Sequence, residues 1–163
     1  MGKFDKQGTI YMIEVKITEE MKKQAWAKSR EMGVIRNSIM KGDGNIAGFL
    51  GEEVANVVID GTISNTYDHD VVSKSGIKYD VKTKRCTSPP RPYYDCSVAN
   101  FNTEQKCDRY VFVRIENKNK RWGKAWVLGW LEHDEYFKKA RKLTKGQVDP
   151  SNGFVVRADC HNV

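Results

Sequence analysis

The chain has 163 residues, of which 28 are lysine or arginine and 21 are aspartate or glutamate, so its net charge is +7 at pH 7. This length favours a single domain with its own core over residues 1–163. No apolar run reaches the roughly 18 residues that a membrane-spanning helix needs, and residues 1–8 lack the apolar stretch of a signal peptide. We therefore expect a cytoplasmic protein without a membrane partner.

Basic residues gather in three segments, 82–91, 118–124 and 138–145. A basic surface attracts the phosphate backbone of DNA, because binding releases condensed counterions. Net charge by itself indicates only non-specific attraction, so these segments can equally be solvated faces of the protein.

The four cysteines are Cys86, Cys96, Cys107 and Cys160, and they include no C-x-x-C pair. Zinc sites usually draw their ligands from such close pairs. We expect reduced thiols, with Cys107 packed at the start of a strand.

The first predicted elements are a strand and a helix. Residues 10–17 are apolar and β-prone, with partial alternation, which predicts a strand. Thr18 can cap a helix from Glu19 to about Met32, because acids fill its first turn and Gly33 follows its end.

A second, amphipathic helix is predicted from about Asn45 to Val58, because its apolar residues recur at helical spacing. The expected buried stripe consists of Ile46, Leu50, Val54, Val57 and Val58. Glu52 and Glu53 lie about 100° apart on this helix, and the period alone does not decide which one turns toward the core edge. Both can also belong to a solvated face.

The most informative segment, Asp70 to Lys84, is typical of two short strands around a Ser-Gly turn. Residues i and i+2 of a strand share a face, so Asp80 and Lys82 emerge side by side while Val81 points into the core. Mg²⁺ prefers hard oxygen ligands such as carboxylates. A lysine beside the cation can stabilise the anionic transition state or help to deprotonate water. The segment therefore predicts a metal site for phosphodiester chemistry.

The length of the turn decides whether Asp70 joins this site. A two-residue loop would place Asp70 opposite Val81, facing away from Asp80. A three-residue loop over residues 74–76, with Gly76 in the left-handed conformation, places Asp70 opposite Asp80. The metal-site interpretation predicts the longer loop, or a bulge with the same effect.

These residues, in this order, resemble the PD-(D/E)XK nuclease superfamily, which includes restriction endonucleases, Holliday-junction resolvases and phage recombination nucleases. The matching pieces are Gly51-Glu52 on the second helix, His69-Asp70, the triplet Asp80-Val81-Lys82, and a strand that begins near Cys107. Together they span residues 45 to about 131. The chain departs from the family pattern at His69, where the family name expects proline, and at Asp80, where glutamate is commoner.

The resemblance implies a restriction-endonuclease-like α/β fold, in which helices flank a mixed β-sheet in a single domain. It implies an enzyme that cleaves DNA, as an endonuclease more than as an exonuclease. The enzyme would depend on Mg²⁺, with Mn²⁺ as a substitute. It would act inside a cell, such as a phage-infected host cell. Asp70, Asp80 and the Val81 carbonyl would hold the metal, and Glu52 rather than Glu53 would complete the site directly or through water. Lys82 would orient or deprotonate the attacking water. Symmetric cutting of both strands would usually require a homodimer.

Prolines predict a loop from Cys86 to Tyr94. Its aromatic residues can stack on bases or simply cover the core. The predicted DNA contacts near this loop are Lys84, Arg85 and Arg91.

The remaining predicted elements complete an α/β order with a mixed sheet. They are strands at Tyr110–Ile115 and Ala125–Leu131, a basic turn at 117–121, a helix from about Asp134 to Lys142, and a last strand near Phe154 to Arg157.

A second function stays open, a basic DNA-binding or assembly module of the same fold without catalysis. The two functions differ in whether the acids converge with Lys82. A binding module has no reason to gather carboxylates beside phosphate, because their repulsion needs a cation to offset it.

Overall fold

The computed structural model describes residues 3–4, 10–32, 43–64, 66, 68–91, 96–99, 105–149, 155 and 159–162. Its helices are α1 (Glu19–Met32), α2 (Asp43–Ile59) and α3 (His133–Lys139). The strands of the central sheet are β3 (Ile13–Lys16), β4 (Thr62–Ile63), β5 (Val71–Val72), β6 (Lys78–Cys86), β8 (Arg109–Lys118) and β9 (Arg121–Glu132). The smaller sheets contain β1 (Lys3–Phe4), β2 (Ile10–Tyr11), β7 (Ser97–Ala99), β10 (Arg141–Leu143) and β11 (Cys160–Asn162).

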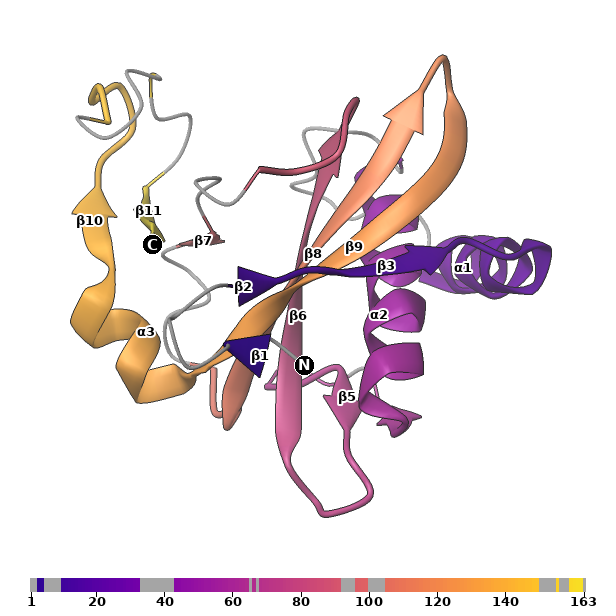
Figure 1. The fold of residues 1–163 in the computed structure, drawn as a ribbon, viewed down its shortest axis with the longest axis horizontal. Coiled ribbons are helices and arrows are strands. Elements are labelled where there is room, and N and C mark those ends of the chain that lie inside the picture. Colours follow the sequence, from indigo (N-terminus) through magenta and orange to yellow (C-terminus); the bar gives the residue numbers. More distant parts are fainter. Residues whose placement is uncertain are drawn as a thin grey trace.

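The central sheet has the strand order β3-β9-β8-β6-β5-β4 (Figure 1). Strands β6 and β8 run parallel, whereas the other neighbours in this sheet are antiparallel. A three-stranded sheet has the order β10-β11-β7, and β1 pairs with β2. The predicted α/β class with a mixed sheet is therefore confirmed.

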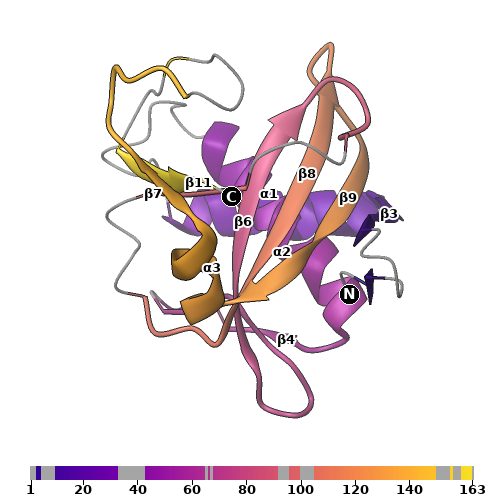
Figure 2. The same cartoon turned by 60° about the vertical axis from the view of Figure 1, so that its left-hand side comes forward.

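Helices α1 and α2 lie on one side of the central sheet, behind β6, β8 and β9 in Figure 2. The bounds of α1 match the prediction, and its cap is the expected one, because the Met21 N–H donates to Thr18 Oγ1 at 3.1 Å. Leu50 and Val54 of α2 are fully buried in a core that the sheet completes with residues such as Val113.

The predicted burial of Val57 on α2 is wrong, because its side chain is 57% exposed. Phe49, which the predicted stripe did not include, is buried. The buried face of this helix is broad, since both α1 and the central sheet pack on it. It is centred on Leu50, Val54 and Ala55, so that Val57 falls beyond its edge. Helical period alone could not show where that face is centred, because the position of the neighbours decides it.

The opposite face of the sheet is also covered, by α3 and the three-stranded sheet (Figure 1). Tyr136 of α3 is the centre of this second cluster, where it packs with Tyr110 and Phe112 of β8. Its hydroxyl lies 2.7 Å from the Cys96 carbonyl and 2.9 Å from the His161 carbonyl. This hydroxyl ties the small sheet to α3, and β8 is consequently buried on both faces.

The C-terminal third departs most from the sequence prediction. Strands β8 and β9 run longer than expected, so only Asn119 and Lys120 remain in their turn. The predicted helix to Lys142 ends at Lys139, because residues 141–143 pair as β10 with the distant β11. The predicted last strand lies outside the described residues except for Val155, which forms a single bridge with Val148.

The predicted loop after the hairpin also needs a correction at its start, because Cys86 still belongs to β6. Residues 87–91 follow as a loop, with Pro90 buried and Arg91 exposed, and residues 92–95 lie outside the described part. Cys107 is buried in the second cluster, as expected. None of the helices that the structure describes is long and apolar enough to cross a bilayer.

Candidate active site

The β5–β6 hairpin has the register that the metal-site interpretation requires. Val71 pairs with Tyr79, and the Ser73 N–H donates to the Ile77 carbonyl at 2.9 Å, which leaves residues 74–76 as the loop. Gly76 has φ +88°, the left-handed conformation that glycine adopts without steric cost. The predicted three-residue loop is therefore confirmed.

Asp70 lies where this pairing ends, directly before β5. Its N–H donates to the Tyr79 carbonyl at 2.8 Å, and its Oδ2 accepts the N–H of Val81 at 2.8 Å. Strand β5 pairs with β6 only at Val71 and Val72, whereas β8 pairs with the other side of β6. The Asp70 side chain therefore caps β6 on the side that β5 leaves unpaired at Val81. The extended register brings Asp70 beside Asp80.

Asp80 and Lys82 share a face of β6 and touch. The Lys82 Nζ lies 2.6 Å from Asp80 Oδ2. Gln105 closes a ring, since its Nε2 donates to Asp80 Oδ1 at 2.9 Å and its Oε1 accepts from Lys82 Nζ at 3.1 Å. Val81, between them, packs against the core under α2, so the predicted alternation is confirmed.

Three carboxyl groups meet around this edge of β6. Glu52 of α2 is only 9% exposed, and Asp80 only 3%. Burial first and the Asp70 carboxylate second raise the pKa of Glu52 to about 9. Burial first and the Asp80 carboxylate second raise the pKa of Asp70 to about 7, although the Val81 N–H and Lys82 oppose this. Glu52 reaches the edge from the α2 side, whereas Asp80 approaches from the opposite face.

The geometry selects between the two helix acids. Glu52 has Asp70 and Asp80 as charged neighbours, and Lys28 Nζ lies 3.8 Å from its Oε2. Burial also raises the pKa of Glu53, but its charged neighbours are Lys28 and Glu20 of α1. Glu52 is therefore the one that lies with the hairpin acids.

Gly51 explains how Glu52 comes so close to the hairpin. A Cβ at Gly51 would clash with the side chain of Thr83 on β6, so only glycine allows α2 to approach the strand this closely. At Gly48, one turn earlier, a Cβ would meet nothing within 4 Å. A physical reason thus explains why glycine precedes glutamate here. Gly51 allows α2 to approach β6 closely, and this approach brings Glu52 to the site.

We expect Gly51→Ala to lower the free energy of unfolding by about 1–3 kcal/mol, because the methyl group overpacks the contact with Thr83. Gly48→Ala is the matched control and should raise it by about 0.5–1 kcal/mol, since alanine favours the helix. Urea unfolding at one pH measures both. Equal stability of the two variants would contradict the close approach.

Two site residues had not been predicted. Lys28 lies on α1, seven residues after Met21 and three residues after Ala25, and both of these residues are buried. A lysine that continues the apolar face of a helix could therefore have been recognised as a candidate site residue. Gln105 has no such signal, because it lies outside any periodic segment and reaches Asp80 only through the fold.

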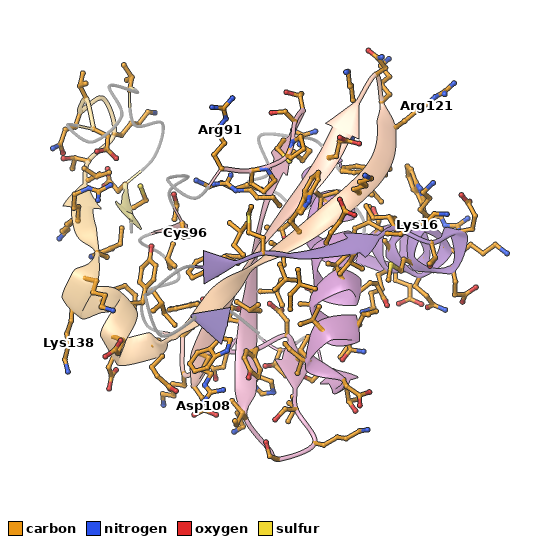
Figure 3. The ribbon with its side chains drawn as sticks, in the orientation of Figure 1. Lys16, Arg91, Cys96, Asp108, Arg121 and Lys138 are labelled. Carbon is orange, nitrogen blue, oxygen red and sulfur yellow. The ribbon has the colours of Figure 1, made fainter. Side chains whose placement is uncertain are left out.

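The predicted DNA-binding residues do not form one cluster. Lys84 lies on the same face as Asp80 and Lys82, and its Nζ donates to Ser97 Oγ at 2.6 Å. Arg85 follows on the opposite face by strand alternation and is exposed. Arg91 is exposed in the loop that follows β6, and Figure 3 shows it at the opposite end of the molecule from Asp108, which directly precedes β8.

The carboxylates offer the oxygen chemistry that a hard divalent cation prefers. Nevertheless, no three Asp, Glu, His or Cys side chains of the described residues are already arranged as a group that could hold an ion. Lys82 instead supplies the positive charge next to Asp80.

Comparisons with known proteins leave the site to be judged by its geometry. No family model matches the chain, and no curated protein matches it. The resemblance to the PD-(D/E)XK superfamily accordingly stays a prediction that rests on the residues described above.

Proposed function

We propose that the protein is a metal-dependent deoxyribonuclease of the PD-(D/E)XK type, with endonuclease action favoured over exonuclease action. The observation that supports this best is the meeting of the buried carboxyl groups of Glu52 and Asp80 with the half-buried carboxyl group of Asp70, beside Lys82. Burial and the neighbouring carboxylates raise the pKa of Glu52 and of Asp70. Crowded acids of this kind destabilise a fold, so they are concentrated at functional sites.

Asp70 and Asp80 are the residues that would hold Mg²⁺, or Mn²⁺ in its place. Glu52 would contribute directly or through water, and the Val81 carbonyl would add an oxygen. The donor set fits, because it consists of oxygens whose mutual repulsion a cation would offset. When bound, the cation would polarise a phosphoryl oxygen and lower the pKa of a coordinated water.

Lys82 is the residue placed to act on the reacting groups. Asp80 and Gln105 hold its ammonium group at the site, and its side chain is only 16% exposed. An ammonium group held in a largely buried site stabilises negative charge developing on a phosphoryl group. It can also orient the attacking water, or accept its proton once Lys82 has lost its own.

The direct test is a cleavage screen on supercoiled, linear, single-stranded and branched DNA with Mg²⁺, Mn²⁺ or EDTA. We expect cleavage with either cation and none with EDTA, and the substrate preference separates endonuclease from exonuclease action. DNA binding without cleavage under every condition would overturn the proposal in favour of the inactive binding module. Sedimentation of the protein with DNA would show whether a homodimer forms.

A further expected result concerns Arg85 and Arg91. If both contact phosphates, Arg85→Gln/Arg91→Gln should weaken DNA binding and reduce the slope of log affinity against log salt by about one unit per lost contact. The control is Lys23→Gln/Lys74→Gln, which removes the same charge from α1 and the β5–β6 loop, both exposed. The measurement is the affinity for DNA in EDTA over a series of salt concentrations. If the slope of the arginine variant matches that of the control, the two arginines do not contact DNA.

A further inference from the structure

The turn between β8 and β9 projects beyond the rest of the central sheet. The end of β6, Cys86, pairs with Glu116, and the end of β3, Lys16, pairs with Lys124. In the described part of the chain, residues 117 and 118 of β8 therefore pair only with residues 122 and 121 of β9. Figure 3 shows Arg121 at the outer end of this hairpin, at the same end of the molecule as Arg91.

The tip of this hairpin, residues 118–121, carries three cations. Lys118, Lys120 and Arg121 are all exposed. No ion pair joins any of them to a carboxylate of the described residues. Their charge is consequently available to a partner, and its density favours a polyanion.

The backbone of the tip favours a functional role over a merely solvated turn. Asn119 has φ +54° and Lys120 has φ +62°, so both central residues are left-handed, as in a type I′ turn. Asparagine suits the first position, but the second is one where glycine is strongly preferred. A lysine there is strained, and such departures are concentrated at binding and active sites.

Cations recur along the strand face that leads from the candidate site to this tip, with Glu116 of β8 as the one acid between Arg114 and Lys118. Lys84 follows Lys82 on the same face of β6 and pairs in register with Arg114 of β8. Lys118 lies four residues further along β8 than Arg114. Asp80 is in register with Tyr110, and at roughly 3.3 Å per residue the tip lies about 26 Å along β8 from that pair.

We propose that the tip of the β8–β9 hairpin binds the phosphate backbone of the DNA duplex whose cleavage we assign to the Asp80 site. This inference rests on the proposed nuclease function. With a rise of about 3.4 Å per base pair, the tip would contact the duplex about 8 base pairs from the reacting phosphate. A substrate shorter than this would miss the contact.

The sharpest variant is Lys120→Gly, because it separates binding from folding. Glycine relieves the left-handed strain, so we expect the thermal midpoint to rise by about 2–4 °C. The same change removes a phosphate contact, so affinity for a 24-base-pair duplex in EDTA should fall and its salt slope should decrease by about one unit. A merely structural lysine would show the gain in stability without the loss of affinity.

The triple variant Lys118→Gln/Lys120→Gly/Arg121→Gln should reduce the salt slope by about two to three units. In Mg²⁺ we expect the wild type to cleave a 24-base-pair duplex faster than a 6-base-pair duplex. The triple variant should lose this difference in cleavage rate. The control is Lys23→Gln/Lys74→Gln/Lys138→Gln, which removes three exposed charges at other places. Circular dichroism checks that each variant is folded.

The outcomes distinguish this inference from the proposed function. In one outcome the wild type cleaves DNA, but the salt slope of the triple variant matches that of the control. This would overturn the proposed contact at the tip and would still support the nuclease function. A tip-dependent slope without cleavage in Mg²⁺ or Mn²⁺ would support the contact and overturn the nuclease. Absence of both binding and cleavage would overturn both.

Discussion

Asp80→Asn should reduce DNA cleavage by on the order of 10²-fold or more while the protein stays folded. Asparagine keeps the shape of the side chain and can still accept the hydrogen bond from Gln105. It removes the charge that ion-pairs with Lys82 and that would hold the cation. Asp70→Asn and Lys82→Ala should have effects of the same order, and the amide oxygen that Asp70→Asn introduces can still accept the Val81 N–H.

The measurement is the single-turnover rate over a range of Mg²⁺ concentrations, with near-UV circular dichroism as the check on folding. Asp60→Asn is the matched control, because the Asp60 side chain is exposed and, among the residues that the structure describes, forms an ion pair with Lys74 alone. Its left-handed φ of +55° also suits asparagine. Full activity of Asp80→Asn with an unchanged Mg²⁺ dependence would contradict the proposed site.

Glu52→Gln should impair cleavage far more than Glu53→Gln, and it should also stabilise the metal-free fold at alkaline pH. Burial raises the pKa of Glu52 from an ordinary 4.5 to about 9. Between these values the folded protein binds the proton more tightly than the unfolded chain, so the wild type loses stability as pH rises. Glutamine has no proton to lose, so the variant escapes this loss.

The difference in free energy of unfolding between Glu52→Gln and the wild type should be small near pH 4. It should grow to on the order of 2 kcal/mol or more at pH 8 in EDTA. Urea unfolding from pH 4 to pH 8 measures this difference. In Glu53→Gln the pH-dependent gain should be smaller, because Glu53 is less deeply buried. A larger loss of cleavage in Glu53→Gln than in Glu52→Gln would move the role to Glu53.

Opposite effects on stability and on cleavage would identify Glu52 as a residue retained for function. A carboxyl that belonged only to the scaffold would give no reason to expect such a trade-off. The same reasoning applies to Lys120. Its φ is left-handed, and glycine would adopt this conformation without strain.

Local chemistry made several features predictable. The hydroxyl of Thr18 and the acids after it predicted the start of α1. Gly76 predicted the three-residue loop, which in turn set the register of Asp70 against Asp80. Strand alternation predicted the contact of Asp80 with Lys82. Each of these depends on residues within about ten positions of one another in the sequence.

By itself, then, the sequence determined the ends of α1, the hairpin register and the shared face of Asp80 and Lys82, because caps, turns and alternation act locally. The helical period left Glu52 and Glu53 open and only the resemblance favoured Glu52, so it was the tertiary structure that placed Glu52 with these acids. The tertiary structure also brought Gln105 to Asp80. It also decided that residues 141–143 leave the helix to form a strand. The reason is that these outcomes depend on packing and pairing between segments far apart in the chain, which no local period encodes.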